Sequence, residues 1–145
     1  MPRPPARPRI LVIDDMPAFL EEILGLLAPE FQVVCSESPL QAIETAARRR
    51  FHLIITTLVM KEMDGFDVIR RLRGANVATP ILMITGYGTA NTAVEAIRLG
   101  ATDYLTKPVE PEELRTRVRR ALQSETSVES VFQTRDERML QLLRL

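Results

Sequence analysis

The sequence predicts an α/β fold in which a five-stranded parallel sheet is doubly wound, with helices on both of its faces. Three observations support this prediction. Five short apolar runs alternate along the chain with five segments whose apolar residues recur at helical spacing. The run at residues 53–56 is apolar on consecutive positions, as expected for a strand that is covered on both sides. Polar residues follow several of the runs, at the strand ends where such folds carry their active groups.

The composition is that of an ordinary globular protein with one domain and a short extension. The chain has 145 residues, of which 46% are hydrophobic and 26% charged. Its 19 basic and 19 acidic residues cancel, so the net charge gives no reason to expect binding to nucleic acid or to a membrane. The single cysteine, Cys35, excludes an internal disulfide and fits a reducing, cytoplasmic setting. No apolar run approaches the roughly 20 residues needed to span a bilayer.

The two ends of the chain differ from the predicted domain over residues 9–123. Residues 1–8 contain four prolines and two arginines, which predicts an extended, disordered arm. In the tail, residues 124–145, Thr126 and Glu129 form a capping box at the start of a further helix. One stripe of that helix carries Val128, Phe132, Met139 and Leu143. Because this apolar side needs cover, we expect the tail to dimerise or to lead into an output module. The alternative is that it folds back on its own domain.

The first two strand–helix units are marked by prolines and by charged residues. Residues 9–13 form the first strand, and the following helix begins at Pro17 and stops before Pro29. Residues 31–35 form the second strand. The next helix begins after Ser38, an N-cap followed by proline, and ends near the three arginines at 48–50, whose charge suits a helix C-terminus. The predicted buried stripe of this helix is Leu40, Ile43 and Ala47.

The remaining units follow the same pattern. After the strand at residues 53–56, a helix with an apolar stripe stops at Gly74, and residues 80–84 form the fourth strand. The fourth helix is closed by Gly100, and residues 103–105 form a short fifth strand. The last helix is acidic in its first turn and basic further on, in agreement with the helix dipole. The predicted buried residues of these three helices are Phe66, Ile69 and Leu72, then Ala93, Val94, Ile97 and Leu99, then Leu114, Val118, Ala121 and Leu122.

The strand ends would bring charged and hydroxyl side chains to one edge of the sheet. Asp14 and Asp15 follow the first strand, Thr57 the third, Thr85 the fourth and Lys107 the fifth. Adjacent carboxylates repel each other and are suited to a hard divalent cation, which oxygen ligands prefer. An N-cap followed by a first-turn acid would explain the two aspartates alone, but it does not explain the whole set.

The chain resembles the receiver domain of bacterial two-component response regulators, the CheY-like domain, over about residues 8–123. The motifs that carry the resemblance are residues 10–15, 63–66, 84–86 and 100–108. It implies a flavodoxin-like sheet with strand order 2-1-3-4-5. It also implies a role in phosphorelay signalling, with a sensor kinase, an output domain or a second copy as partner. The face formed by the fourth helix, the fifth strand and the fifth helix would bind such a partner.

The resemblance also implies a role for individual site residues. Asp14 and Asp15 match the acid pair that holds Mg²⁺, and Val59 matches the residue that lends the metal its backbone carbonyl. Thr85 matches the switch hydroxyl that binds the phosphoryl group, and Gly86 keeps the neighbouring position unobstructed.

Two further residues complete the set that the resemblance implies. Lys107 matches the lysine that pairs with acceptor and phosphate oxygens, and Pro108 after it follows a cis bond in the family. Tyr104 matches the aromatic residue that turns inward on activation.

The chain departs from the family at the residue that accepts phosphate. The family pattern is Asp-Leu-x-Met-Pro-x-Met-Asp-Gly, and residues 57–65 read TLVMKEMDG, with Thr57 and Lys61 in place of the aspartate and the proline. A threonine hydroxyl is not ionised at neutral pH and needs a base to act as a nucleophile. The only histidine, His52, lies about 15 Å away at the rise of a strand. Loss of one of three carboxylates would also weaken Mg²⁺ binding.

We therefore predict a pseudo-receiver: a regulatory module that is not an enzyme, does not form an aspartyl phosphate and acts through protein contacts. Asp64 belongs to the helix entry, so it does not replace the acceptor. One alternative is an ordinary phosphorelay receiver whose acceptor was replaced by mutagenesis. Another, from a different class, is a Mg²⁺-dependent phosphohydrolase that uses Asp14, although no second nucleophile accompanies the acid pair.

Overall fold

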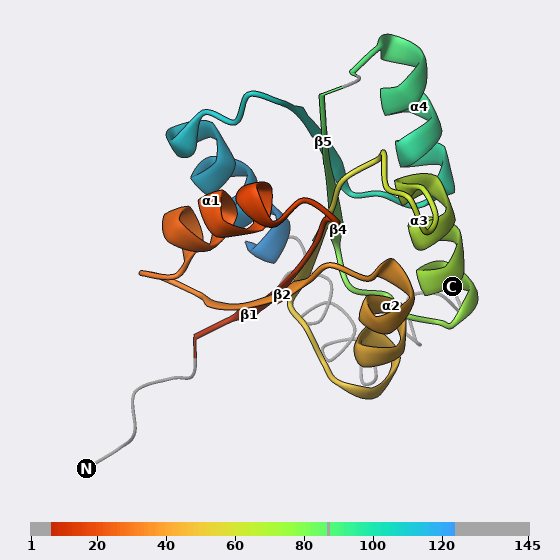
Figure 1. The fold of residues 1–145 in the computed structure, drawn as a ribbon, viewed down its shortest axis with the longest axis horizontal. Helices are drawn as coiled ribbons and strands as arrows, with labels where there is room; N and C mark the ends of the chain where they lie inside the picture. The colour runs from red at the N-terminus through yellow and green to blue at the C-terminus, as the bar shows by residue number, and fades with distance from the viewer. Residues whose placement is uncertain (1–6, 87, 124–145) are drawn as a thin grey trace, which may run out of the picture.

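Five parallel strands form the centre of the molecule in the order β2-β1-β3-β4-β5 (Figure 1). The computed structural model describes residues 7–86 and 88–123. The arm over residues 1–6 and the tail helix predicted for 124–145 lie outside the described residues. The elements run β1 (Arg9–Ile13), α1 (Pro17–Leu27), β2 (Gln32–Ser36), α2 (Pro39–Arg48), β3 (Leu53–Thr56), α3 (Gly65–Gly74), β4 (Ile81–Thr85), α4 (Ala90–Leu99) and β5 (Asp103–Thr106). A fifth helix follows over residues 111–123. The predicted doubly wound sheet and its strand order are confirmed.

The alternation of side chains along the strands divides the core into two layers. In β1, Ile10 and Val12 pack on one face of the sheet, against α1 and the fifth helix. Leu11 and Ile13 pack on the other face, against α2, α3 and α4. Figure 1 shows these two groups of helices on opposite sides of the sheet. The central strand β3 is buried along its whole length, as its uninterrupted apolar run predicted.

Two helices present a different face to the core than the sequence pattern predicted. In α2 the buried residues are Pro39, Ala42 and Ala46, whereas Leu40 is 43% exposed. The buried face of α2 differs from the predicted one because Pro39, at the start of the helix, packs against the domain. The small side chains of Ala42 and Ala46 then allow the helix to approach the sheet closely. In α4 only Ala96 is buried, and the stripe predicted through Val94 and Ile97 is exposed (55% and 49%).

The N-terminal boundary of the packed domain lies slightly before β1. The Arg7 guanidinium donates to the Ala28 carbonyl (3.0 Å), and the Pro8 carbonyl accepts the Gln32 N–H (2.9 Å). Residues 7 and 8 are therefore attached to the domain. Among the described residues, no helix is both long enough and apolar enough to cross a membrane.

Candidate functional site

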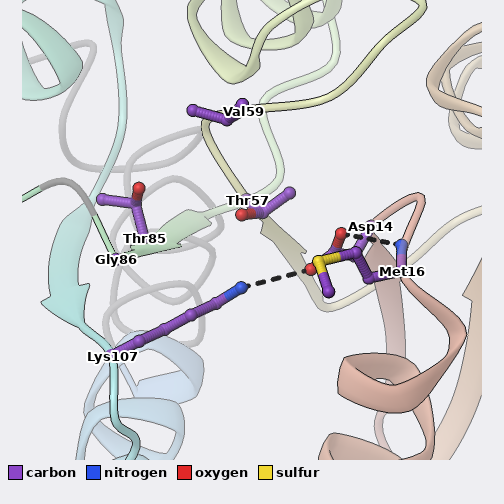
Figure 2. Close-up of a pocket in the computed structure, with 7 residues that line it drawn as sticks. All are labelled: Asp14, Met16, Thr57, Val59, Thr85, Gly86 and Lys107. Carbon is purple, nitrogen blue, oxygen red and sulfur yellow. Dashed lines mark hydrogen bonds and ion pairs between the residues drawn. The ribbon is translucent and has the colours of Figure 1, made fainter.

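Four loops at the carboxyl edge of the sheet surround a shallow cavity of about 200 Å³. Figure 2 shows the Thr57 side chain at the end of β3, between Thr85 on one side and Asp14 on the other, with Lys107 extending across toward Asp14. The cavity is lined by Asp14, Met16, Thr57, Val59, Thr85, Gly86 and Lys107. Six of these seven residues were predicted from the sequence. The structure therefore brings together the groups that follow β1, β3, β4 and β5.

Asp14 is the most deeply buried charged group of the site, at 1% exposure. Its Oδ1 accepts the Met16 N–H (3.0 Å), and its Oδ2 lies 3.4 Å from the Lys107 ammonium. Burial raises the pKa of this carboxyl above the ordinary 3.8, while the Met16 N–H and Lys107 offset part of the rise. Such a group contributes stability below pH 3.8 that is lost as the pH rises through its folded-state pKa. At neutral pH the ionised Asp14 therefore costs folding free energy, as is common at functional sites.

Lys107 is held between Asp14 and an aromatic ring. Its Nζ lies 3.9 Å from the centroid of the Phe19 ring, in cation–π contact. Its backbone N–H donates to the Thr85 carbonyl (2.9 Å), which joins the end of β5 to that of β4. The peptide bond from Lys107 to Pro108 is cis, as the family resemblance implied.

The two aspartates of the acid pair point to different partners. Asp15 is half-buried, and its Oδ2 accepts the Lys61 N–H (2.8 Å) from the loop that follows Thr57. Asp14 instead faces the cavity and Lys107. Each carboxylate of the pair thus has a donor from the protein itself.

Thr57 is firmly positioned, and neither His52 nor Asp64 is placed to act on its hydroxyl. It is only 4% exposed, and its N–H donates to the Ile13 carbonyl (3.2 Å). The one histidine of the sequence, His52, precedes β3 at the opposite end of that strand, where its Nδ1 accepts the Arg9 N–H (2.9 Å). Asp64 is occupied as the N-cap of α3, where its side chain accepts the Asp67 N–H (2.9 Å). Neither residue can activate the Thr57 hydroxyl.

The donor set fits a tightly bound magnesium ion poorly. In the part of the chain that the structure describes, no group of three or more histidine, cysteine, aspartate or glutamate side chains is placed to hold a metal ion. What remains is two carboxylates, both already hydrogen-bonded, and the backbone carbonyl of Val59. Mg²⁺ demands a near-ideal octahedron of oxygen ligands and gives up its waters reluctantly, so this set would hold it weakly.

Tyr104 lies outside the cavity, half-buried on β5. Its hydroxyl is 2.9 Å from Oγ1 of Thr92, a residue of α4 that was not predicted as part of the site. Thr92 also completes a reciprocal capping box with Thr89 at the start of α4, and that spacing could have identified it.

Met16 is the other residue that was not predicted. It contributes its backbone N–H and lies at the rim of the cavity, so the type of its side chain could not indicate a role in the site.

Residues 10–119 match the family model of the response regulator receiver domain. The chain belongs to this family. Receiver domains typically bind Mg²⁺ in their acidic pocket, and they interact with kinases and output domains of two-component systems.

This receiver is 34% identical over 122 residues to the transcriptional regulatory protein ZraR of Escherichia coli K12, a match that covers 83% of this chain and 28% of ZraR. It is 35% identical over 131 residues to the transcriptional regulatory protein CusR of the same strain, covering 88% of this chain and 58% of CusR.

The receiver thus spans only part of the length of these two regulators. Among solved structures, it is similar to the beryllofluoride-activated NtrC4 receiver domain dimer, with a TM-score of 0.76 and 26% identity. That match covers 80% of this chain and 97% of the NtrC4 chain.

Proposed function

We propose that this receiver is a pseudo-receiver: a regulatory interaction module that does not accept a phosphoryl group at residue 57 and that catalyses no reaction of its own. One observation carries the proposal. The buried residue at the end of β3, Thr57, carries a hydroxyl, which is not ionised at neutral pH, where the family has an ionised carboxylate. The other groups around it, Asp14, Thr85 and Lys107, are of the types that the family uses.

Without an acceptor, the balance between the inactive and active shapes of the receiver is set by its sequence, by a partner or by another ligand. Thr57 keeps the β-branched shape that suits a strand end, so the fold survives the substitution. The site then serves to hold the loops at the carboxyl edge of the sheet in place. It binds Mg²⁺ only weakly. Asp15, Val59 and Gly86 have structural roles at the rim of the cavity, and Tyr104 has one on β5.

The surface made by α4, β5 and the fifth helix is the proposed contact face. Val94 and Ile97 on α4 are about half exposed, which is unusual for large apolar side chains of one helix stripe. A sensor kinase, an output domain or a second copy of the chain would cover this face, and the tail over residues 124–145 would extend the contact. We place the protein in the cytoplasm, with no contact to a membrane and no direct binding of nucleic acid by this domain.

Multi-angle light scattering of the full chain tests this proposal. We expect the same molar mass with and without acetyl phosphate and Mg²⁺, because no phosphoryl group is taken up to shift the equilibrium. Removal of residues 124–145 is expected to lower the mass from dimer to monomer. A mass that changes on addition of acetyl phosphate would contradict the proposal, and identical monomers for both chains would remove the tail as a dimerisation element.

A further inference from the structure

The loop between Thr57 and α3 is fixed on two sides by two adjacent residues, Lys61 and Glu62. On one side, the Lys61 N–H donates to Asp15 Oδ2 at 2.8 Å. On the other side, Glu62 Oε1 accepts both the Leu40 N–H (2.9 Å) and the Ser38 hydroxyl (2.9 Å) at the start of α2. Both contacts involve an ionised carboxylate, which makes them stronger than neutral hydrogen bonds. The second also places a negative charge at a helix N-terminus, where the dipole favours it.

The contact to Asp15 depends on the type of residue at position 61. A proline, which the family pattern has at this position, has no backbone N–H and could not make it. The two departures of this chain from the pattern therefore act on the same acid pair. Thr57 removes a carboxylate from beside it, and Lys61 supplies a donor to one of its members.

We infer that the Lys61 amide occupies Asp15 in place of a divalent cation and holds the loop after Thr57 without metal. Asp14 is satisfied in the same way by the Met16 N–H and the Lys107 ammonium. A cation that binds the pair must displace or share these donors, so the Lys61 amide lowers the affinity of the site for metal. The inference concerns the cation and the loop, and it stands or falls separately from the proposal on phosphoryl transfer.

Binding of Mn²⁺, followed by the electron paramagnetic resonance signal of the free ion, tests the inference on the full chain. Thr57→Asp serves as the background, because a third carboxylate brings the affinity into a measurable range. Onto it we add either Lys61→Pro, which removes the N–H, or Lys61→Ala, which keeps the N–H and removes the ammonium. We expect the proline variant to bind Mn²⁺ about tenfold more tightly than the alanine variant, the scale of a hydrogen bond to a charged group.

The alanine variant separates the backbone amide from the side-chain charge of Lys61. Equal affinities of the proline and alanine variants would overturn the inference, as would tighter binding by the alanine variant. Amide hydrogen exchange in the natural chain provides a second test that does not depend on the folding of a proline variant. We expect the Lys61 amide to exchange slowly, and to exchange at least about tenfold faster in Asp15→Ala. Exchange of this amide in the natural chain at the rate of an open loop would also overturn the inference.

Discussion

Thr57→Asp is expected to convert this receiver into one that takes a phosphoryl group from acetyl phosphate. The substitution places an ionised oxygen between Asp14 and Thr85, with Lys107 already positioned across the cavity (Figure 2). With saturating Mg²⁺, we expect the phosphorylation rate to rise by at least about 10²-fold over the natural chain, because an un-ionised hydroxyl is replaced by an ionised carboxylate nucleophile. Phosphate-affinity gel electrophoresis at timed intervals measures this rate.

Thr57→Asn is the matched control, since it has the shape of aspartate without the charge. We expect it to remain unphosphorylated, and we expect hydroxylamine to remove the group from the aspartate variant. A folded aspartate variant that reacts no faster than the asparagine variant would show that the rest of the site has also lost its function. This receiver would then differ from the family in the function of further site residues, and not at Thr57 alone.

Gly65→Ala is expected to destabilise the domain by about 2–3 kcal/mol, the scale of overpacking in a core. Gly65 begins α3 and is packed against the loop that carries Thr57. A Cβ at this position would overlap the Thr57 carbonyl oxygen, and it would lie 2.7 Å from Met83 Cε and 3.0 Å from Leu58 Cα. Met83 can yield, but the backbone of residues 57 and 58 cannot move without disturbing the end of β3. Urea denaturation followed by circular dichroism measures the loss.

Gly74→Ala is the matched control at the other end of the same helix. Apart from its chain neighbours and the backbone of its own helix, no atom lies within 4 Å of the Cβ that it would add. Alanine is favoured over glycine in a helix, so this variant is expected to be unchanged or more stable by up to about 1 kcal/mol. Equal destabilisation by the two substitutions would mean that close packing against Thr57 is not what requires glycine at position 65.

The central strands and the site could be predicted because both depend on local patterns. The bounds of β1 and β3 match their apolar runs, and the topology then brings the residues that follow β1, β3, β4 and β5 to one edge. At the edge of the sheet the pattern is weaker. There β2 is only partly buried and runs from Gln32 to Ser36, one residue later than predicted, while Phe31 turns into the core.

The helix faces and the long-range hydrogen bonds could not be predicted in this way. The face that α2 or α4 turns to the core depends on how the helix packs on the sheet. When its apolar stripe is wider than the surface that contacts the sheet, the sequence alone does not determine the rotation of the helix about its axis. Arg73 illustrates the second limit. Its guanidinium donates to the carbonyls of Gly100, Val77 and Thr79, contacts that no sequence pattern indicates. The Lys61 amide on Asp15, across 46 residues of sequence, is of the same kind.

The intact mass of the natural chain after incubation with acetyl phosphate and Mg²⁺ tests the central claim most directly. The Thr57→Asp variant, treated in the same way, shows that the reagents are active. We expect the natural chain to keep its unmodified mass while the variant gains one phosphoryl group. Any adduct of one phosphoryl mass on the natural chain would contradict the claim that this receiver has lost its acceptor, and hydroxylamine would then distinguish an acyl phosphate, which it removes, from a phosphate ester on Thr57, which it leaves in place.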